Sequence, residues 1–293
     1  MSVLLADNNR SVVFMAITRL LLMSCWNPLY TFKVIWGYRS LIYQLTKRDF
    51  IQRYKGSCLG LVWTLITPIL FLLIYMFVFN VVMKARWGIS PNEGPMEFAL
   101  GLFCGLILWG IFSETSTSAP NLILSNPSYV TKTVFPLEIL PVIIVGSGLI
   151  RAAISLAILF AGILLFGNGI SWTLIILIIP FIGMVLFSLG TVWFLSALGV
   201  FMRDVSHIVS VMVTLLFFLT PIVYPASRVP GKLRFVIYAN PFTHLVEGAR
   251  AVTIWGKMPE WPWLMLSIAI SVVVFQVGYV FFIKSKSAFA DVM

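Results

Sequence analysis

A basic cluster between residues 47 and 55 holds the side chains whose chemistry points most directly to a ligand. The candidate ligand-binding residues are Arg48, Arg53, Tyr54 and Lys55, with Lys47 just before them. Guanidinium groups pair well with phosphate oxygens, so this cluster could receive a phosphate or pyrophosphate group. It could equally anchor the chain at a membrane surface, because Lys and Arg collect on the cytoplasmic side of membrane proteins. Both interpretations stay open.

Aromatic residues form 15% of the chain, and several of them recur at helical spacing. Pyranose rings present C–H faces that stack on aromatic rings, and Tyr and Trp add a polar group. A path lined in this way could hold a sliding sugar polymer without a deep charged site. The alternative for each ring is packing in the core or against lipid. The candidates for such a path are Phe71, Tyr75, Phe79, Trp109, Phe112, Phe217, Phe218 and Tyr224.

Arg151 lies in the middle of an apolar stretch, where an arginine costs about 2.5–3.5 kcal/mol. Its guanidinium must therefore face protein or water, either to pack the helices together or to line a path. Glu114 is a candidate partner. However, helix rise places the two residues about 12 Å apart in depth, so we expect no direct ion pair between them.

Patterns for catalysis or metal binding are not evident. The two histidines, His207 and His244, lie far apart, and the three cysteines form no CxxC pair. The expected cytoplasmic acids are scattered and form no DxD pair, which a membrane-embedded glycosyltransferase would need for a metal-bound nucleotide sugar. These acids are Asp7, Asp49, Glu138, Asp204 and Asp291. We therefore expect no catalytic residue, no metal site and no cofactor in this chain.

Two Gly-Lys pairs could belong to a phosphate-binding loop, but neither fits one. Gly231-Lys232 is followed by Leu233, and Gly256-Lys257 is followed by Met258, whereas the loop requires Ser or Thr. Any ATP-driven activity would then depend on a separate protein.

The elements that carry these residues must lie in a membrane. Of the 293 residues, 60% are hydrophobic and 10% are charged, and the mean hydropathy is +1.01. Soluble domains carry roughly 25% charged residues. The composition excludes a soluble enzyme, a disordered chain and a disulfide-built secreted module, and it predicts an all-α multi-pass membrane protein.

Runs without charged residues locate the transmembrane helices. The run 152–202 is too long for one helix, and Phe166-Gly167-Asn168-Gly169 is the expected turn within it. We predict six spans, over residues 58–83, 97–119, 138–166, 171–200, 206–225 and 262–283.

A further, amphipathic helix is predicted over residues 33–48, lying in the membrane interface. Its polar face comprises Lys33, Gly37, Ser40, Gln44 and Lys47, and its apolar face comprises Val34, Tyr38, Leu41, Ile42 and Leu45. The polar face could also dock a cytoplasmic partner.

The distribution of Lys and Arg predicts the orientation. Twelve of them lie on the side of the termini and seven on the other side. Both termini are therefore expected in the cytoplasm. In a membrane protein, a net charge of +10 reflects the orientation in the membrane and contact with anionic lipid. We therefore expect no nucleic-acid partner.

We expect a single transmembrane domain over residues 1–293. Its parts are a cytoplasmic N-terminal region (1–57), spans one to five (58–225), an extracytoplasmic segment (226–258), the last span (262–283) and a cytoplasmic tail (284–293). In the extracytoplasmic segment, Asn240 and Pro241 predict the start of a helix that runs to about Ile254. We expect His244, Glu247 and Arg250 on one face of it, making local pairs.

A family resemblance rests on several motifs in order. Residues 48–63 read RDFIQRYKGSCLGLVW and fit the pattern RDxxxRYKGSxLGxxW, with Pro68 inside the following span. Later motifs are Asn126-Pro127, KTVFPLEILP at 132–141, Arg203-Asp204, TPIVYP at 220–225 and Asn240-Pro241. Over about residues 30 to 285 the chain resembles type-2 ABC exporter permeases for O-antigen, capsule and teichoic acid, the O-antigen exporters most of all.

This resemblance implies several partners. One is a second copy of this chain, and another is a separate ATPase in two copies, which would hold the ATP and Mg. The substrate would be a lipid-linked polysaccharide whose pyrophosphate binds the basic cluster, and the membrane would be the bacterial inner membrane. The loop 120–137 would be a coupling helix on the ATPase, consistent with its length of 18 residues, and 226–258 would form a re-entrant helix pair. The expected ATPase-coupling residues are Asn126, Pro127, Lys132, Phe135, Arg203 and Asp204.

Two rival functions are set against this one. A type-2 ABC permease for a small hydrophobic drug would share the topology, but it would need neither the N-terminal motif nor an aromatic path. A membrane-embedded glycosyltransferase is the enzymatic rival, and the scattered carboxylates argue against it.

Overall fold

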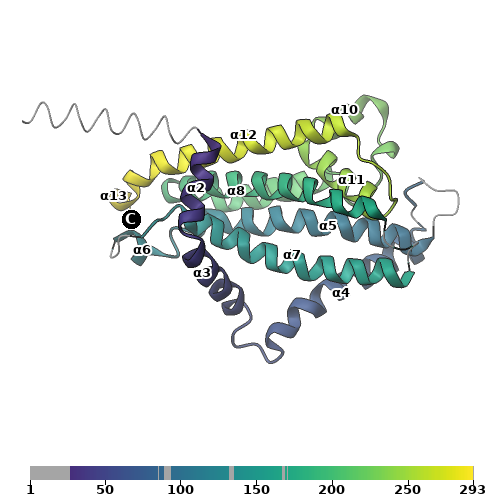
Figure 1. Ribbon diagram of the computed structural model, residues 1–293, viewed down its shortest axis with the longest axis horizontal. Coiled ribbons are helices and arrows are strands. Elements are labelled where there is room, and N and C mark those ends of the chain that lie inside the picture. Colours follow the sequence, from purple (N-terminus) through teal and green to yellow (C-terminus); the bar gives the residue numbers. More distant parts are fainter. Residues whose placement is uncertain are drawn as a thin grey trace, which may run out of the picture.

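The computed structural model describes residues 27–84, 86–88, 94–131, 135–166, 169 and 171–292, and every regular element in these ranges is a helix (Figure 1). Four long helices run along the length of the molecule: α5 (Pro95–Ser118), α7 (Ile139–Phe166), α8 (Ile178–Phe201) and α12 (Trp261–Ser285). A 3-10 segment, Trp172–Leu177, precedes α8. These helices begin and end within a few residues of four of the predicted spans.

The first predicted span is also present, but its ends are irregular. A 3-10 turn (Gly60–Val62) leads into α4 (Trp63–Tyr75), which continues as a π-helical segment (Met76–Val82). In the described part of the chain, five helices are long and apolar enough to cross a membrane, and the stretch Gly60–Phe79 is one of them. This stretch has no buried residue within the single chain.

The fifth predicted span, 206–225, is wrong in its length. Helix α9 covers Val205–Leu219, 15 residues, or about 22 Å of helix. It ends because Thr220 precedes Pro221, and a residue before proline is pushed into an extended conformation. Thr220 has φ −100° and ψ 132°. Counting uncharged residues could not reveal this ending, since residues 220–225 are also uncharged.

The predicted helix 33–48 is two helices. α2 (Pro28–Gly37) and α3 (Arg39–Gln52) meet at Tyr38, whose φ of −98° and ψ of 13° break the helical path. The expected apolar face of α3 packs on protein, because Leu41, Ile42 and Leu45 contact a cluster of buried residues. α3 crosses α7 where Thr46 is buried against Gly146.

The packing of α8 against α12 forms the centre of one hydrophobic core. Trp193 of α8 is fully buried and lies edge-on to Phe275 and Tyr279 of α12, at 5.2 Å from each ring. The two helices approach most closely at Gly190 and Gly278, where a Cβ on either glycine would overlap backbone atoms of the other helix. Glycine is therefore required at both positions.

Short elements lie at the two ends of the bundle (Figure 1). α6 (Pro127–Thr131) and α13 (Phe289–Val292) lie at one end, here called the α6 end, where Lys286 forms an ion pair with Glu138 at 2.6 Å. α10 (Gly231–Ala239) and α11 (Pro241–Thr253) lie at the other, the α11 end. The predicted start of α11 is confirmed, since Asn240 Oδ1 accepts a hydrogen bond from Phe242 N at 3.0 Å. Lys132, Gly167 and Asn168 lie outside the described residues.

Candidate functional site

A cavity of about 330 Å³ opens between α4, α5 and α7. Five of the residues singled out from the sequence line it together: Tyr54, Phe71, Tyr75, Trp109 and Arg151. Glu114 also lines it, as do the polar side chains of Thr64, Thr67, Ser113 and Ser155. The cavity thus combines aromatic faces, hydroxyl groups and one pair of opposite charges, which is the chemistry suited to a hydroxyl-rich ring.

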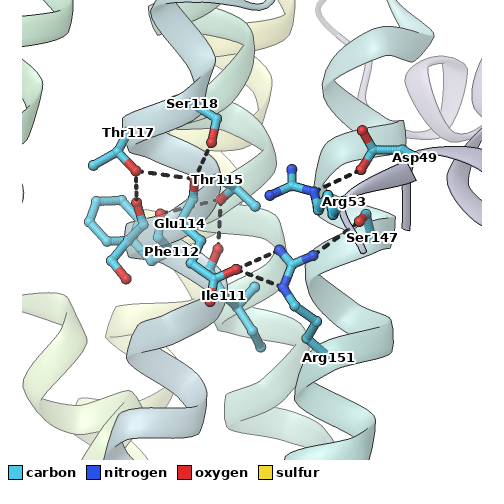
Figure 2. A network of polar contacts seen from close by, with 11 residues as sticks. Asp49, Arg53, Ile111, Phe112, Glu114, Thr115, Thr117, Ser118, Ser147 and Arg151 are labelled. Carbon is cyan, nitrogen blue, oxygen red and sulfur yellow. Dashed lines mark hydrogen bonds and ion pairs between the residues drawn. The ribbon is translucent and has the colours of Figure 1, made fainter. Parts of the chain in front are cut away.

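The charged pair in this cavity is a direct ion pair (Figure 2). Arg151 Nε and Nη2 lie 2.7 Å and 2.5 Å from Glu114 Oε2, and Arg151 Nη1 donates to Ser147 Oγ at 3.1 Å. The Glu114 side chain is 51% exposed and that of Arg151 16% exposed, so the carboxylate remains open to the cavity. The expectation of no direct pair is therefore wrong.

The physical reason lies in the direction of helical side chains, which lean toward the N-terminus of their own helix. α5 and α7 run antiparallel (Figure 1). The rule therefore makes side chains on α5 lean toward the α11 end and side chains on α7 lean toward the α6 end. Each side chain therefore spans part of the distance between the two Cα atoms along the bundle axis. Helix rise gives only the positions of the Cα atoms, so it does not include the length of the side chains.

Only part of the basic cluster reaches the cavity. Tyr54 lines the cavity and lies edge-on to Phe50, with 5.6 Å between the ring centres. Arg53 pairs with Asp49 at 3.2 Å, on the α3 side of the network drawn in Figure 2. Arg48 and Lys55 are exposed and do not line the cavity. Of the four candidate residues, the structure brings only Tyr54 to the cavity wall.

The aromatic stripe of α4 leads from the cavity toward the α11 end. Phe71 stacks on Tyr75 at 6.0 Å, and Tyr75 lies 6.2 Å from Phe79. Phe79 lies 5.9 Å from Phe98 of α5, and Phe98 stacks on Trp87 at 4.8 Å. This series of rings, the α4–α5 aromatic series, is continuous from Phe71 to Trp87.

The other aromatic candidates lie outside the α4–α5 aromatic series, although Trp109 also lines the cavity. Trp109 and Phe112 are 6% and 3% exposed and pack on Phe242 of α11 at 5.6 Å and 4.5 Å, so Phe112 belongs to the core. Phe217 contacts Trp109 at 5.9 Å. Phe218 is exposed, and its carbonyl oxygen accepts a hydrogen bond from the Tyr224 hydroxyl. The structure does not bring these residues into the α4–α5 aromatic series.

The candidate ATPase-coupling residues that are described lie near the α6 end. Asn126 Nδ2 donates to Leu122 O at 2.9 Å, just before Pro127 begins α6. Phe135 stacks on Tyr129 of α6 at 4.3 Å. Arg203 and Asp204 are exposed in the turn between α8 and α9.

Arg250 is the residue whose environment sequence reasoning missed. Its side chain is fully buried and donates to Gly101 O, Pro221 O and Ile222 O at 2.7, 2.6 and 2.5 Å. The guanidinium carbon lies 4.2 Å from the centre of the Trp87 ring. We expected local pairs on α11, but Glu247 interacts with Arg250 only through its charge. The small residues beside it, Gly248, Ala249 and Ala251, were the available signal of a closely packed helix.

Comparison with known proteins identifies the family. Residues 40–254 match the ABC-2 type transporter family. The chain belongs to this family. The resemblance found from the motifs is thereby confirmed, and the chain is a multi-pass permease related to O-antigen export permeases. The matched range begins in α3 and ends just after α11, so it includes the cavity, α6 and Arg250.

Three curated relatives of this ABC-2 permease carry one name. It is 30% identical over 259 residues to the O-antigen export system permease protein RfbA of Myxococcus xanthus, covering 88% of this chain and 96% of the relative. It is 28% and 29% identical over 255 residues to two RfbA proteins of Klebsiella pneumoniae, covering 86% of this chain and 95% of each relative.

Proposed function

We propose that this ABC-2 permease is the membrane subunit of an ATP-driven exporter that moves lipid-linked O-antigen polysaccharide across the bacterial inner membrane. The observation that carries the proposal is the cavity between α4, α5 and α7. Its aromatic walls suit the C–H faces of sugar rings, and the Glu114 carboxylate can accept hydrogen bonds from sugar hydroxyls. Three relatives named as O-antigen export permeases support the same substrate class.

The proposed orientation places the α6 end in the cytoplasm. In this arrangement α9 and the non-helical residues 220–225 together make the fifth of six crossings, which brings both termini to the cytoplasmic side. The excess of Lys and Arg on that side supports the orientation. The exposed residues Arg48 and Lys55 then face the cytoplasm, where they bind the pyrophosphate of the lipid-linked glycan together with Arg53. Tyr54 connects this headgroup site to the cavity.

The proposed motor is a separate ATPase that holds the ATP and Mg, in two copies for two copies of this chain. Its contact surface on the permease is α6 with the segment around Phe135, and the turn at Arg203 and Asp204. The second copy of the permease packs on α4, whose large apolar side chains, among them Leu65, Ile69 and Leu73, are exposed in the single chain. Closure of the ATPases then moves α6 and changes the width of the path beside α4.

A capsule or teichoic acid exporter would use the same sugar chemistry, and a drug permease would not. A small hydrophobic drug gains nothing from an ion pair and several hydroxyl groups in its path, because it offers them no hydrogen bonds in place of those with water. The mixed lining of the cavity therefore favours a glycan.

Export in a strain that lacks this gene tests the proposal. Expression of the wild-type chain should restore O-antigen-bearing lipopolysaccharide at the cell surface, as seen on gels and with antibodies to the polysaccharide. Phe71→Leu, which removes a ring from the cavity, should lower the export rate several-fold. Phe77→Leu is the matched control, because Phe77 lies on the same segment, is 60% exposed and does not line the cavity. Failure of the wild-type chain to restore export, or equal loss in both variants, would contradict the proposal.

A further inference from the structure

A second cavity, of about 280 Å³, lies at the α11 end and shares no lining residue with the first. Its walls come from α10, α11, the segment after α11 and the loop that carries Trp87. The side chains that could bind a ligand are those of Tyr238, Glu247, Trp255, Lys257 and Glu260. The function proposed above assigns no role to this cavity.

The indole of Trp255 gives the first indication of a ligand. Its Nε1 atom is buried and has no hydrogen-bond partner among the residues that the structure describes. A buried donor without an acceptor costs about 1–3 kcal/mol, so buried polar groups are nearly always paired. Because Trp255 lines the cavity, a ligand with an acceptor oxygen could supply the missing partner.

The carboxylates give the second indication. Glu247 is largely buried, and burial raises its pKa above the ordinary value, with the charge of Glu260 acting in the same direction. Arg250 and a hydrogen bond from the Ala226 backbone act in the opposite direction. Two carboxyl groups disfavour an anionic ligand such as a phosphate, but they accept hydrogen bonds from hydroxyl groups. His244 does not compete for this role, because its Nε2 already pairs with Tyr238 O at 2.8 Å.

The aromatic rings give the third indication. Trp87 and Trp255 both line the cavity and lie edge-on to each other, with 6.3 Å between the ring centres. An aromatic face beside a free donor and carboxyl acceptors matches a neutral pyranose, which has one apolar C–H face and hydroxyl groups around its rim. Trp87 is also the last ring of the α4–α5 aromatic series that starts at Phe71 in the first cavity.

We propose that the second cavity is a sugar-binding subsite that holds a pyranose unit of the glycan at the outer side of the membrane. In this subsite Trp255 Nε1 donates to a ring or hydroxyl oxygen, and Glu247 and Glu260 accept from hydroxyl groups. The inference rests on the proposed function in two respects: the cargo is a glycan, and the α11 end faces away from the cytoplasm. The subsite retains the polymer between successive cycles of ATP hydrolysis.

Binding of the free polysaccharide to the purified permease–ATPase complex in lipid nanodiscs tests this subsite. The probe is the O-polysaccharide released from the host's lipopolysaccharide by mild acid, and its dissociation constant is measured by calorimetry. Trp255→Phe keeps an aromatic ring but removes the N–H donor, so binding should weaken about three- to ten-fold. Trp261→Phe is the matched control, because Trp261 is exposed and lies outside the lining. It should bind like the wild type.

Two further variants keep the test decisive. Glu247→Gln should also weaken binding several-fold. This variant tests the subsite if Trp255→Phe does not fold. Phe71→Leu alters the first cavity. When Trp255→Phe is added to Phe71→Leu, it should weaken binding by the same factor as it does in the wild type. Binding that is the same in the wild type, Trp255→Phe and Glu247→Gln, or no binding by the wild type, would overturn the subsite. If the wild-type chain still restored export in the deletion strain, the proposed function would stand without it.

Discussion

Arg151 of α7 and Glu114 of α5 form an ion pair on the wall of the first cavity, with Nη2 and Oε2 2.5 Å apart. The pair holds two long neighbouring helices together and gives the cavity a carboxylate that is half exposed. An arginine at this depth would be costly without a partner. Glu114 accepts a hydrogen bond from Arg151 Nε, and Ser147 accepts one from Nη1, so the pair serves both the packing of the bundle and the chemistry of the cavity.

The ion pair should show coupling in a double-mutant cycle. Arg151→Gln and Glu114→Gln should each lower the free energy of unfolding by about 1 kcal/mol, a modest effect because the Glu114 carboxylate is half exposed to solvent. The double variant should lose less than the sum of the two, with a coupling of about 0.5–1 kcal/mol. Reversible unfolding in mild detergent measures all four proteins. Strictly additive losses would show that the two side chains do not stabilise each other.

Arg250 should matter far more for stability. Arg250→Met keeps the length of the side chain but leaves Gly101 O, Pro221 O and Ile222 O buried without their donor. We expect a loss of about 3–5 kcal/mol in the free energy of unfolding. Arg250→Lys should recover little of it, because a single ammonium group cannot reach three carbonyls in the fork geometry of a guanidinium.

The control for Arg250 is an exposed arginine at the same end of the bundle. Arg228 donates one hydrogen bond, to Arg86 O at 3.2 Å, and is exposed. Arg228→Met should cost less than about 1 kcal/mol. Thermal unfolding of the purified variants measures the difference, and an Arg250→Met protein as stable as Arg228→Met would contradict the role assigned to the buried guanidinium.

Adding even a methyl group where α8 crosses α12 should lower the stability of the fold. Gly190→Ala and Gly278→Ala each place a Cβ onto the backbone of the facing helix, so the helices must separate and we expect a loss of more than about 3 kcal/mol. Gly110→Ala is the matched control within α5, because nothing lies within 4 Å of its added Cβ. Alanine there should be neutral or stabilise the helix by about 0.5–1 kcal/mol. Thermal midpoints of the three variants check this order, and equal midpoints would contradict the close approach.

Glu247 should make stability depend on pH. Burial raises its pKa in the folded protein above the ordinary value of 4.5. The folded state therefore binds this proton more tightly than the unfolded state. The resulting stability is fully present below about pH 4.5 and is lost as the pH rises through the folded pKa. Thermal midpoints of the wild type should accordingly fall over this window relative to those of Glu247→Gln. A difference between the two proteins that stays constant with pH would contradict the assignment.

Sequence reasoning located the spans well because charged residues are largely excluded from hydrocarbon. The uncharged runs 152–202 and 261–283 mark α8, α12 and the second half of α7. The end of α9 was missed because proline, and not charge, terminates it. The Arg151–Glu114 pair was missed because helix rise locates Cα atoms, whereas long side chains on antiparallel helices lean toward each other.

Arg250 could not have been placed from the sequence. The three carbonyl groups that it binds lie 28, 29 and 149 residues away along the chain. Backbone carbonyls carry no sequence signature, so only the folded arrangement shows where the guanidinium points. The shared helix face of Phe71 and Tyr75 was predicted from their spacing, but the separation of Phe112 into the core depends on its contact with Phe242.

Transport by purified components tests the central claim, that this permease is a path for glycan powered by a separate ATPase. Proteoliposomes are prepared with the chain alone, with the ATPase alone and with both, and are given labelled lipid-linked O-antigen and ATP. We predict ATP-dependent movement of the glycan across the bilayer only when both proteins are present, and less movement with Phe71→Leu than with Phe77→Leu. Glycan movement by the chain alone, or none with both proteins and ATP, would contradict this account.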